Sequence, residues 1–395
     1  MKDRSQWLPL ASGQRPLYVG VDLGGTNIKA GLVDDLGRTI AFHTEPTHAA
    51  RGPEDAAARM GRSVHTLCAL AGIAIDDIAR VGLGTPGPQD LPTGVIIRAG
   101  NLPGWDGFPI RDRVALHCGL PVTFANDANA AAYGEFWMGS AKDFSSLVLL
   151  TLGTGVGGGI IIGDLSIDGA HSHGSECGHI IVDTAETARK CPCGQPGHLE
   201  AYSSATALKA RAQESLQADP TSSLARAVAS GEELSPILIA REAGAGDSAA
   251  MEVLMDAARW LGIGIVTLMH TIDPEAVVIG GAMTFGGEAA PVGRAFIDRV
   301  RSEVHSRTFP TLAAKTVIRY ASLGGDAILC QAFDAATSRL APAVHIAGRT
   351  KPGAGPRHIV FGQGGRMLYV VNELDGSINV FGSSFRNSGE YFFCG

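Results

Sequence analysis

The N-terminal part of the chain alternates short apolar runs with turn sequences rich in Gly and Asp. Turns at 22–27 and 34–37 separate the runs. Apolar runs of this length between tight turns are typical of β-hairpins. We therefore predict a three-stranded antiparallel meander, with strands at Leu17–Val21, Ile28–Val33 and Arg38–Phe42.

Helical and strand-like patterns alternate through the rest of the chain. Ala, Arg, Met and Leu recur with a helical period over residues 53–72, and a run rich in Ala covers Asn126–Met138. This alternation is typical of an α/β protein. Further strands are predicted at 78–83, 122–125, 146–151, 160–162 and 276–279, and further helices at 203–258, 260–270 and 326–338.

One pattern occurs twice in the sequence. It consists of an apolar strand, a Leu-Gly turn with small polar residues, and a second apolar strand. The first turn is Asp22–Asn27 and the second is Leu152–Gly159. Self-similarity of this kind predicts an internal duplication of one supersecondary unit.

The composition changes near the C-terminus. Residues 341–357 contain three Pro and three Gly, which is typical of a linker. Strand-like runs follow at His358–Phe361, Met367–Asn372 and Ser377–Phe381. We expect an N-terminal α/β domain over 1–125, a larger α/β domain over 126–325, a helix over 326–340 that packs back on the N-terminal domain, a linker over 341–357 and a strand-rich tail over 358–395.

Charge and composition exclude several classes of protein. The formal net charge is −7 and no long basic run is present, which disfavours a nucleic acid or an anionic membrane as partner. Residues 1–16 lack the apolar segment of a secretory signal, and the uncharged run Leu147–Gly163 carries six glycines. We therefore expect a soluble cytoplasmic protein without a membrane span. The seven cysteines are better explained by free thiols and a metal site than by a disulfide framework.

The first glycine turn differs from both common phosphate-binding motifs. It lacks Gly-Lys-Ser/Thr, and a strand rather than a helix follows it. Its backbone N–H groups and the Thr26 hydroxyl could hold a phosphate, and Asp22 could hold Mg²⁺ through water. An ordinary hairpin also requires glycine, so both interpretations stay open.

The second turn adds weight to phosphate binding. Five of the seven residues from Gly153 to Gly159 are glycine, more than a simple hairpin needs. Two such turns could hold the phosphates of a nucleotide from both sides. Gly280 and Gly281 follow a buried strand and offer a third close approach, at the adenosine, although a structural bulge explains them equally well.

Two further residues stand where a strand gives way to a helix. Asn126 and Asp127 are favoured helix caps, and Asp127 is also placed to take a proton from a substrate hydroxyl. The two roles are compatible, since Asn126 can cap the helix while Asp127 acts as a base.

Several of these motifs together resemble the ROK family of sugar kinases, and within it the bacterial glucokinases. The resemblance runs from about Leu17 to about Phe333. It implies the actin-like (ribonuclease-H-like) ATPase fold, with two α/β domains around a cleft that closes on sugar and ATP, and a homodimer. The matching motifs are Asp22–Asn27, Gly84–Gly87, Asn126–Ala130, Leu152–Gly155 and Glu176–His179.

The resemblance also implies roles for individual residues. Asp127 is the catalytic base. The sugar site comprises Asn101, Asn126, Asp127, Glu176, His179 and Glu200; Asn101 also suits a turn, and Glu200 also suits an exposed helix start. ATP and Mg²⁺ are assigned to Asp22, Gly24, Gly25, Thr26, Asn27, Lys29, Gly153, Thr154, Gly155, Gly280 and Gly281.

A structural zinc site is predicted from two thiols and two imidazoles, a donor set that suits tetrahedral Zn²⁺. The four residues are His179, Cys191, Cys193 and His198. The family pattern is Cys-x-Cys-Gly-x-x-Gly-Cys-x-Glu, and His198 stands where that pattern has its third cysteine. Cys177, His171 and His173 are alternative donors, and two free cysteines beside two surface histidines are the alternative to a metal site.

The activity that this resemblance implies is ATP-dependent phosphorylation of a hexose at its 6-hydroxyl, with glucose as the expected substrate. N-acetylmannosamine, N-acetylglucosamine, fructose and mannose are alternative substrates, and polyphosphate is an alternative donor. The sugar-sensing regulators of the family carry an N-terminal helix-turn-helix domain. We do not expect that branch, because the first predicted strand already begins at Leu17.

The tail resembles a blade of the lactonase β-propeller family, which includes 6-phosphogluconolactonases. The similar residues are Gly355–His358 and Gly365–Glu373. A propeller needs typically 4–8 blades, so a single blade cannot form a working lactonase. We expect a short strand-rich extension left by a gene fusion or a shortened reading frame.

Overall fold

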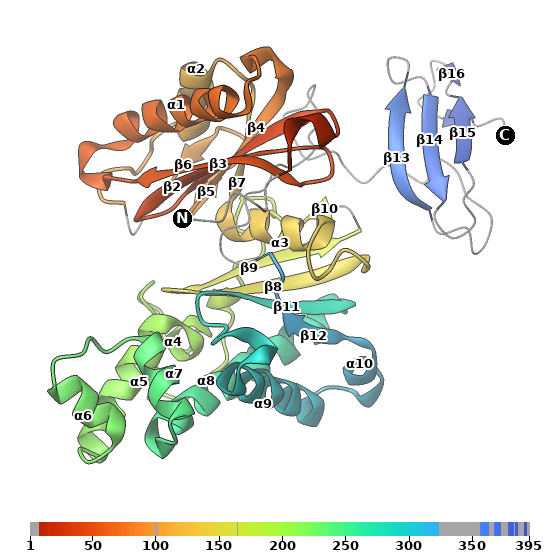
Figure 1. Cartoon of the computed structure of the whole chain (residues 1–395). Helices are drawn as coiled ribbons and strands as arrows, with labels where there is room; N and C mark the ends of the chain where they lie inside the picture. Colours follow the sequence, from red (N-terminus) through yellow and green to blue (C-terminus); the bar gives the residue numbers. More distant parts are fainter. Residues whose placement is uncertain are drawn as a thin grey trace. The chain divides into compact units, whose positions relative to one another are not determined.

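The computed structural model describes residues 8–98, 102–163 and 165–323, together with strands between residues 356 and 392. The chain divides into two compact units, residues 1–340 and 341–395, which are described separately (Figure 1). The first unit contains two five-stranded sheets with helices, and the α/β class expected from the sequence is confirmed.

The first sheet has the strand order β3-β2-β1-β4-β7. Strands β1, β2 and β3 are antiparallel neighbours, which confirms the predicted meander. Strands β1, β4 and β7 are parallel, so their carboxyl ends lie at the same edge of the sheet. The strands are β1 (Leu17–Leu23), β2 (Asn27–Val33), β3 (Thr39–Pro46), β4 (Ile78–Thr85) and β7 (Val122–Asn126).

Helices α1 (Pro53–Ala71) and α2 (Ile110–Cys118) pack beside each other and cover the first sheet (Figure 1). Helix α1 begins with Pro53 in its first turn, and it ends at Gly72, whose φ of 69° is left-handed. Its buried face includes Met60 and Val64, which join the apolar residues of β1 and β4 in one core. The short elements here are η2 (Leu10–Ser12), η3 (Ala49–Arg51), η4 (Ile75–Asp77), β5 (Gln89–Asp90) and β6 (Val95–Ile96).

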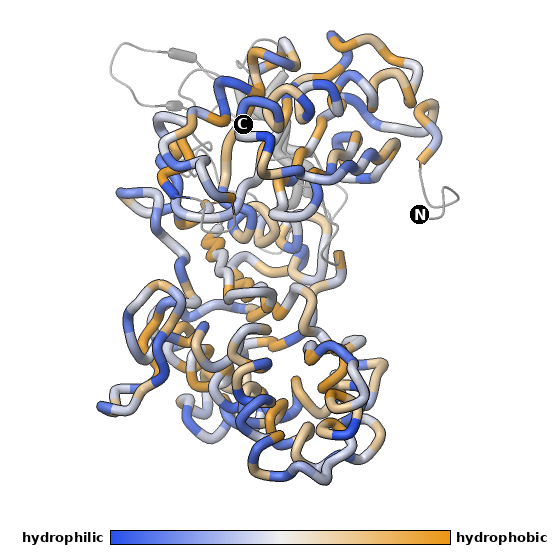
Figure 2. The backbone as a smooth tube through the Cα atoms, turned by 90° about the vertical axis from the view of Figure 1, so that its left-hand side faces the viewer, coloured by the Kyte–Doolittle hydropathy of each residue, from blue (hydrophilic) through white to orange (hydrophobic). Residues whose placement is uncertain are grey.

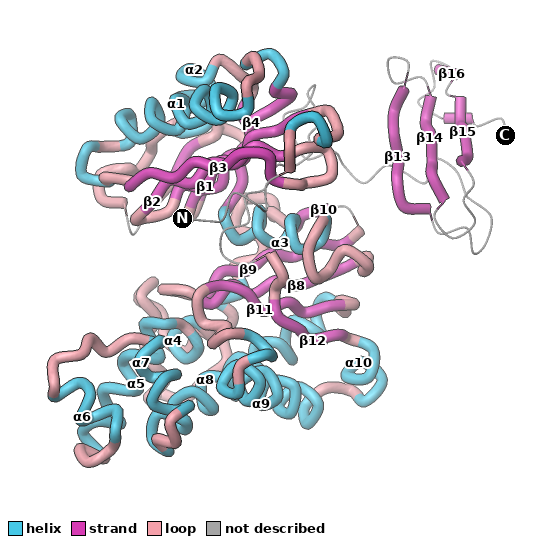
Figure 3. The backbone as a smooth tube through the Cα atoms, viewed as in Figure 1, coloured by secondary structure: helices cyan, strands magenta, loops and turns pink. Residues whose placement is uncertain are grey.

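The second sheet repeats the first. Its strands lie in the order β10-β9-β8-β11-β12 (Figure 3). Strands β8, β9 and β10 are antiparallel neighbours, and β8, β11 and β12 are parallel. Position by position, this is the pattern of strand directions in the first sheet, in agreement with the predicted duplication. The strands are β8 (Ser146–Leu152), β9 (Val156–Ile162), β10 (Leu165–Ser166), β11 (Ala276–Gly281) and β12 (Val317–Tyr320).

The helices of the second half form its larger core. Helix α8 carries the fully buried Ala257, Leu261 and Ile265, and its sequence was predicted as helical. Along these helices the tube in Figure 2 changes repeatedly between hydrophobic and hydrophilic colours, as expected where one helix face is buried. The elements are η5 (Cys177–His179), α4 (Glu200–Ser203), α5 (Ala205–Ala218), α6 (Ser223–Ala229), α7 (Pro236–Gly244), α8 (Ser248–Ile272), η6 (Gly287–Ala289), α9 (Pro291–Arg307) and α10 (Pro310–Lys315).

The second unit contains a three-stranded antiparallel sheet of the order β13-β14-β15. These strands agree with the three predicted in the tail, to within two residues at each end. The helix expected over 326–340 and residues 341–355 of the expected linker lie outside the described residues. The strands are β13 (Pro356–Gly362), β14 (Met367–Asn372) and β15 (Ile378–Gly382), with a separate pair β16 (Ser384–Phe385) and β17 (Tyr391–Phe392).

Within the described residues, every helix is too short or too polar to cross a bilayer.

Candidate active site and metal cluster

The candidate base Asp127 lies at the carboxyl edge of the parallel strands of the first sheet. In the strand register, Asp22 at the end of β1 pairs with Gly84, and Thr85 at the end of β4 pairs with Asn126. Asp127 follows directly as the first residue of helix α3 (Asp127–Trp137). Three adjacent strand ends therefore collect Asp22 and Asp127 at one edge, where ligands of open α/β sheets usually bind.

Asn126 caps helix α3. Its Oδ1 accepts hydrogen bonds from the backbone N–H of Ala128 at 2.9 Å and of Asn129 at 3.3 Å. Asp127 Oδ1 also accepts from Ala128, at 2.8 Å. The capping interpretation of Asn126 is confirmed, and the cap fixes the backbone from which the Asp127 carboxylate projects.

The Asp127 carboxyl is set to exchange its proton near neutral pH. Its side chain is open to solvent, yet the surrounding protein desolvates the carboxylate and raises its pKa to about 7. Nearby negative charge on Asp22 raises this pKa further, and Glu176 adds a smaller contribution, while the hydrogen bond from Ala128 lowers it. Asp22 and Glu176 thus both lie close enough to act electrostatically on Asp127.

The first glycine turn is a tight hairpin between β1 and β2. The Gly24 N–H donates to the Asn27 carbonyl at 2.9 Å, and a Cβ on Gly24 would lie 2.9 Å from the same oxygen. Glycine is therefore required there by the turn itself. Gly25 and Thr26 are exposed. Lys29 pairs with Asp22 across the two strands, with Nζ 4.0 Å from Oδ2.

Most glycines of the second turn have a packing role that the sequence analysis did not foresee. A Cβ on Gly157 or Gly159 would collide with helix α3, and one on Gly158 would lie 2.5 Å from Cys177 Sγ. These three glycines let α3 and the segment before η5 approach strand β9. Gly153 differs, because a Cβ there would meet no atom within 4 Å. The number of glycines in this turn is therefore not evidence for phosphate binding. The space beside Gly153, however, is open.

Gly280 and Gly281 lie beside the second turn. In the register of β11 with β8, Gly281 pairs with Leu152, which immediately precedes Gly153. Gly281 has a φ of 89°, and a Cβ on it would lie 2.7 Å from the Leu152 nitrogen. The fold alone thus explains Gly281, and the structural interpretation of this pair is supported.

Two carboxylates predicted for the sugar site, Glu176 and Glu200, lie next to residues of the metal cluster. Glu200 begins α4; its Oε2 accepts from the Val156 N–H at 2.9 Å, and Cys191 Sγ lies 3.6 Å from its Oε1. Glu176 Oε2 lies 3.9 Å from His179 Nε2. Asn101, the remaining residue predicted for the sugar site, lies outside the described residues.

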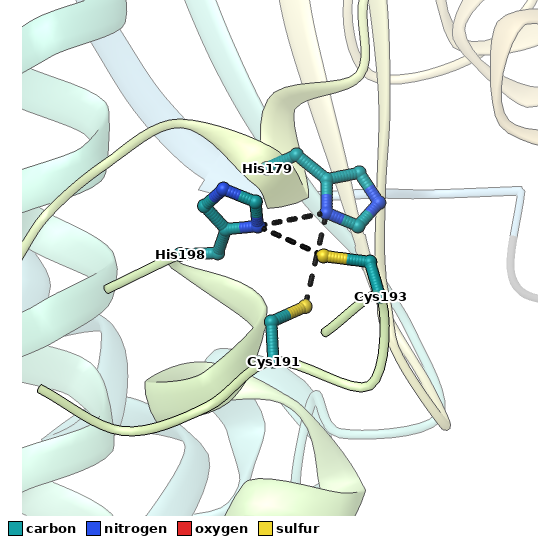
Figure 4. Close-up of side chains that lie close together, drawn as sticks. All are labelled: His179, Cys191, Cys193 and His198. Atoms are coloured by element: carbon teal, nitrogen blue, oxygen red, sulfur yellow. Dashed lines mark hydrogen bonds between the residues drawn. The ribbon is translucent and has the colours of Figure 1, made fainter. Parts of the chain in front are cut away.

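The four residues predicted to bind zinc converge on one point (Figure 4). One donor atom from each lies within 4.8 Å of all the others. His198 Nδ1 lies 3.2 Å from His179 Nδ1 and 3.3 Å from Cys193 Sγ, and Cys191 Sγ lies 3.8 Å from His179 Nδ1. Zn–N and Zn–S bonds in a tetrahedron imply donor separations of roughly 3.3–3.8 Å. The donor set and its spacing therefore fit Zn²⁺.

The alternative donors stand outside this cluster. Among the described residues, the group that could hold a metal contains His198 and none of Cys177, His171 and His173. Cys177 is buried, and desolvation raises the pKa of its thiol to about 12. His179 turns Nδ1 toward the cluster and Nε2 toward Glu176, so its two ring nitrogens serve different sides.

The sequence analysis missed two threonines that hold the glycine turns. Thr47 donates its hydroxyl hydrogen bond to Gly24, and Thr206 donates one to Thr154. These partners are 23 and 52 positions apart, so no local motif marks them.

Comparison with known proteins identifies the first unit. The sequence model of the ROK family matches residues 18–336. A glucokinase of Halalkalibacterium halodurans is 33% identical over 310 residues, which cover 78% of this chain and 92% of that protein.

Solved structures show the same fold. A ROK hexokinase from Thermus thermophilus superposes with a TM-score of 0.65 at 32% identity, over 79% of this chain and 94% of its own. A ROK family glucokinase from Streptomyces griseus, in complex with glucose and AMPPNP, gives a TM-score of 0.64 at 31% identity, over 79% of this chain and 96% of its own. The expected actin-like ATPase fold is confirmed.

The C-terminal part has a second similarity. Residues 299–392 match the model of the family described as Lactonase, 7-bladed beta-propeller. The described part of this match up to residue 323 includes about half of α9, all of α10 and all of β12. Strand β12 pairs with β11 in the second sheet of the first unit. The resemblance of the tail to this family is thus confirmed. Since the ROK match spans four fifths of the chain and the relatives align over nearly their whole length, the chain belongs to the ROK family.

Proposed function

We propose that this protein transfers the terminal phosphoryl group of ATP to the 6-hydroxyl of a hexose, and that glucose is its preferred substrate. Support for the sugar comes from the glucokinase of H. halodurans at 33% identity and from the S. griseus glucokinase, which was solved with glucose and AMPPNP. Support for the chemistry comes from the arrangement of the chain's own side chains.

The position and pKa of Asp127 carry this proposal. A carboxylate that is open to solvent, with a pKa of about 7, can accept a proton from a sugar hydroxyl at neutral pH. Removing that proton as the oxygen attacks phosphorus leaves a neutral carboxyl on Asp127. Phosphoryl transfer requires little other covalent chemistry from the protein, so positioning and charge stabilisation complete the mechanism.

We assign ATP to the two glycine turns. The exposed Gly25 and Thr26 of the first turn offer backbone N–H groups for phosphate oxygens. In the second turn the Gly153 N–H is bound to the Gly155 carbonyl at 3.0 Å, and what Gly153 offers is open space in which a phosphate can approach the backbone. Asp22 and its strand partner Lys29 lie beside the first turn, where a carboxylate would hold Mg²⁺ and an ammonium would face phosphate. When bound, Mg²⁺ neutralises charge on the phosphates.

We assign the hexose to the polar side chains on the other side of Asp127. Glu176 acts electrostatically on Asp127 and faces His179 Nε2, so these groups line one region. Zn²⁺ on His179 Nδ1 would fix the imidazole ring, and the Nε2 N–H could then donate to a sugar hydroxyl. Asn101, Asn126 and Glu200 complete the proposed set; zinc is structural and takes no part in the phosphoryl transfer.

A coupled assay of ADP release tests this function. Purified protein is given ATP and Mg²⁺ with glucose, mannose, fructose, N-acetylglucosamine or N-acetylmannosamine. A parallel series contains polyphosphate as donor and is followed by the sugar phosphate formed, because this donor releases no ADP. We expect the highest kcat/KM with glucose and ATP. A folded protein that binds a sugar in calorimetry but phosphorylates none of the five with either donor would reject the kinase in favour of a sugar-sensing role.

A further inference from the structure

Both glycine turns receive the same pair of hydrogen bonds from outside their hairpins. At the first turn, Thr47 donates its N–H to the Thr26 carbonyl at 2.8 Å and its hydroxyl to the Gly24 carbonyl at 2.5 Å. At the second turn, the N–H of Ala205 donates to Gly153 at 2.8 Å, and the hydroxyl of Thr206 donates to Thr154 at 2.8 Å. A backbone N–H and a threonine hydroxyl therefore brace each turn.

These bonds determine where the free N–H groups of the turns point. A trans peptide is planar, and its C=O and N–H lie on opposite sides. A hydroxyl that holds the Gly24 carbonyl therefore also orients the N–H of Gly25 in the other direction. In the same way, the bond to the Thr154 carbonyl orients the N–H of Gly155.

The first brace is itself rigidly held. Thr47 is fully buried. The guanidinium of Arg59 donates to the Pro46 carbonyl at 2.7 Å and also to the Thr47 carbonyl, and Arg59 is only 5% exposed. From the other side, the indole N–H of the buried Trp105 donates to Ala49 at 3.3 Å. The segment around Thr47 is thus fixed at three carbonyls, which lets the threonine restrain the turn.

The hydrogen bond from Thr206 to the second turn is less well protected from solvent than the one from Thr47 to the first. Thr206 is exposed at the start of α5, and the nearby cap of that helix is the bond from the Ala207 N–H to Ser204 Oγ at 3.1 Å. Water can replace a hydroxyl at an exposed position far more easily than at a buried one. The buried brace should therefore matter more than the exposed one.

We propose that Thr47 and Thr206 are positioning residues, whose hydroxyl groups hold the two turns in the conformation that binds the phosphates of the nucleotide. This inference rests on the proposed function, since it concerns the same ATP site. Neither threonine touches the reacting atoms in this account; each acts through the turn that it holds.

The test compares Thr47→Val with Thr47→Ser. The valine variant loses the hydroxyl and keeps the shape, and its KM for ATP should rise about 2- to 10-fold, the value of one hydrogen bond. The KM for the sugar should stay unchanged, and Thr47→Ser should retain the wild-type KM for ATP. Thr206→Val should raise the KM for ATP by a smaller factor.

Thr44→Val is the matched control. Thr44 on strand β3 also donates its hydroxyl to a backbone carbonyl, that of Ile28 at 3.3 Å, but this carbonyl lies outside the turn. Its KM for ATP should equal that of the wild type. An equal rise in Thr44→Val and Thr47→Val, or an equal rise in the KM for both substrates, would overturn the proposal.

Calorimetric binding of AMPPNP separates this inference from the proposed function. If the wild-type protein binds AMPPNP but phosphorylates no sugar, the kinase proposal fails while the brace is still tested by the binding constants. Thr206 is exposed, so Thr206→Val tests the account even if Thr47→Val does not fold. Unchanged AMPPNP affinity in both valine variants, or in Thr206→Val alone where Thr47→Val is unfolded, would reject the proposal.

Discussion

The two sheets of the first unit share one frame but differ in chemistry. Each has five strands in the same order and with the same directions, and each places a glycine turn between its central strand and the neighbouring antiparallel strand. At the end of the fifth strand, however, the first sheet carries Asp127, while the second continues into Ala321 and Ser322. The two sheets thus carry two similar turns, but the candidate base Asp127 follows the fifth strand of the first sheet alone.

The turns differ as well. In the first, Gly24 is required by the hairpin geometry. In the second, Gly157 and Gly159 are required by the packing of helix α3. At Gly153, no protein atom lies close enough to exclude a Cβ. Among the described residues, the metal cluster also lies in the second half. Glycines in similar sequences therefore have different roles: some are required by turn geometry or packing, and others leave space in which a ligand can bind.

The largest effect on kcat is expected from a change at Asp127, which follows the fifth strand of the first sheet and has no counterpart after the fifth strand of the second. Asp127→Asn keeps the helix start and most hydrogen bonds but cannot accept the proton, so kcat should fall by about 10²- to 10⁴-fold. Sugar binding, measured by calorimetry, should persist. Asp168→Asn is the control, because burial also raises the pKa of Asp168 while that residue is held by Asn129 and Ser166 away from the proposed chemistry. Equal losses of kcat in both variants would remove Asp127 from its role.

The second effect concerns the metal cluster of the second half. Cys191→Ser removes a buried donor, so the purified variant should lose zinc, and kcat/KM for the sugar should fall by about tenfold or more because His179 is no longer fixed. Elemental analysis measures the zinc content of the variant and of the wild-type protein. We expect one zinc ion per chain in the wild type. Wild-type protein that contains no metal and stays fully active after exhaustive chelation would contradict a zinc site.

A smaller effect separates packing glycines from ligand glycines. Gly153→Ala should leave the thermal stability unchanged, since its Cβ meets no protein atom, but should raise the KM for ATP several-fold. Gly159→Ala should instead lower stability, by about 1–3 kcal/mol, because its Cβ collides with Ala132 on α3. Thermal unfolding and ATP kinetics are measured for both. A Gly153→Ala protein with wild-type KM for ATP would mean that no phosphate uses this space.

The smallest effect is expected from the C-terminal tail. A chain that ends after residue 340 loses the second unit, and its kcat and KM for sugar and ATP should equal those of the full chain. Circular dichroism establishes that the shortened protein is folded. A folded but inactive protein would show that the lactonase-like segment contributes to the kinase.

Local sequence patterns predicted the elements that carry the site. The apolar runs with glycine turns located β1, β2, β8 and β9, and the Asn-Asp pair located the start of α3. Helix α9 was overlooked, although Val292, Phe296, Val300 and Val304 repeat every four residues, so a signal was present. These features could be predicted because each depends on residues close together in the sequence.

Features that depend on tertiary contacts could not be predicted in this way. The glycines at 157–159 were attributed to phosphate, because only the structure shows helix α3 and Cys177 against β9. Thr47 had no signal at all, since its partner in the turn is 23 positions away. The pKa of Asp127 likewise depends on the burial around it and on Asp22 and Glu176, which three separate segments bring together.

The role of Asp127 as the base is best tested by the pH dependence of ADP release with glucose. Asp127 must be ionised to accept the proton. Desolvation by the surrounding protein, together with the charges of Asp22 and Glu176, raises its pKa to about 7, although Lys29 lies next to Asp22. We expect kcat/KM to fall tenfold for each pH unit below about 7 and to be level above it, and we expect Asp127→Asn to abolish this pH dependence. Activity that stays constant down to pH 5, where an ordinary carboxylate would still be ionised, would contradict Asp127 as the base in this environment.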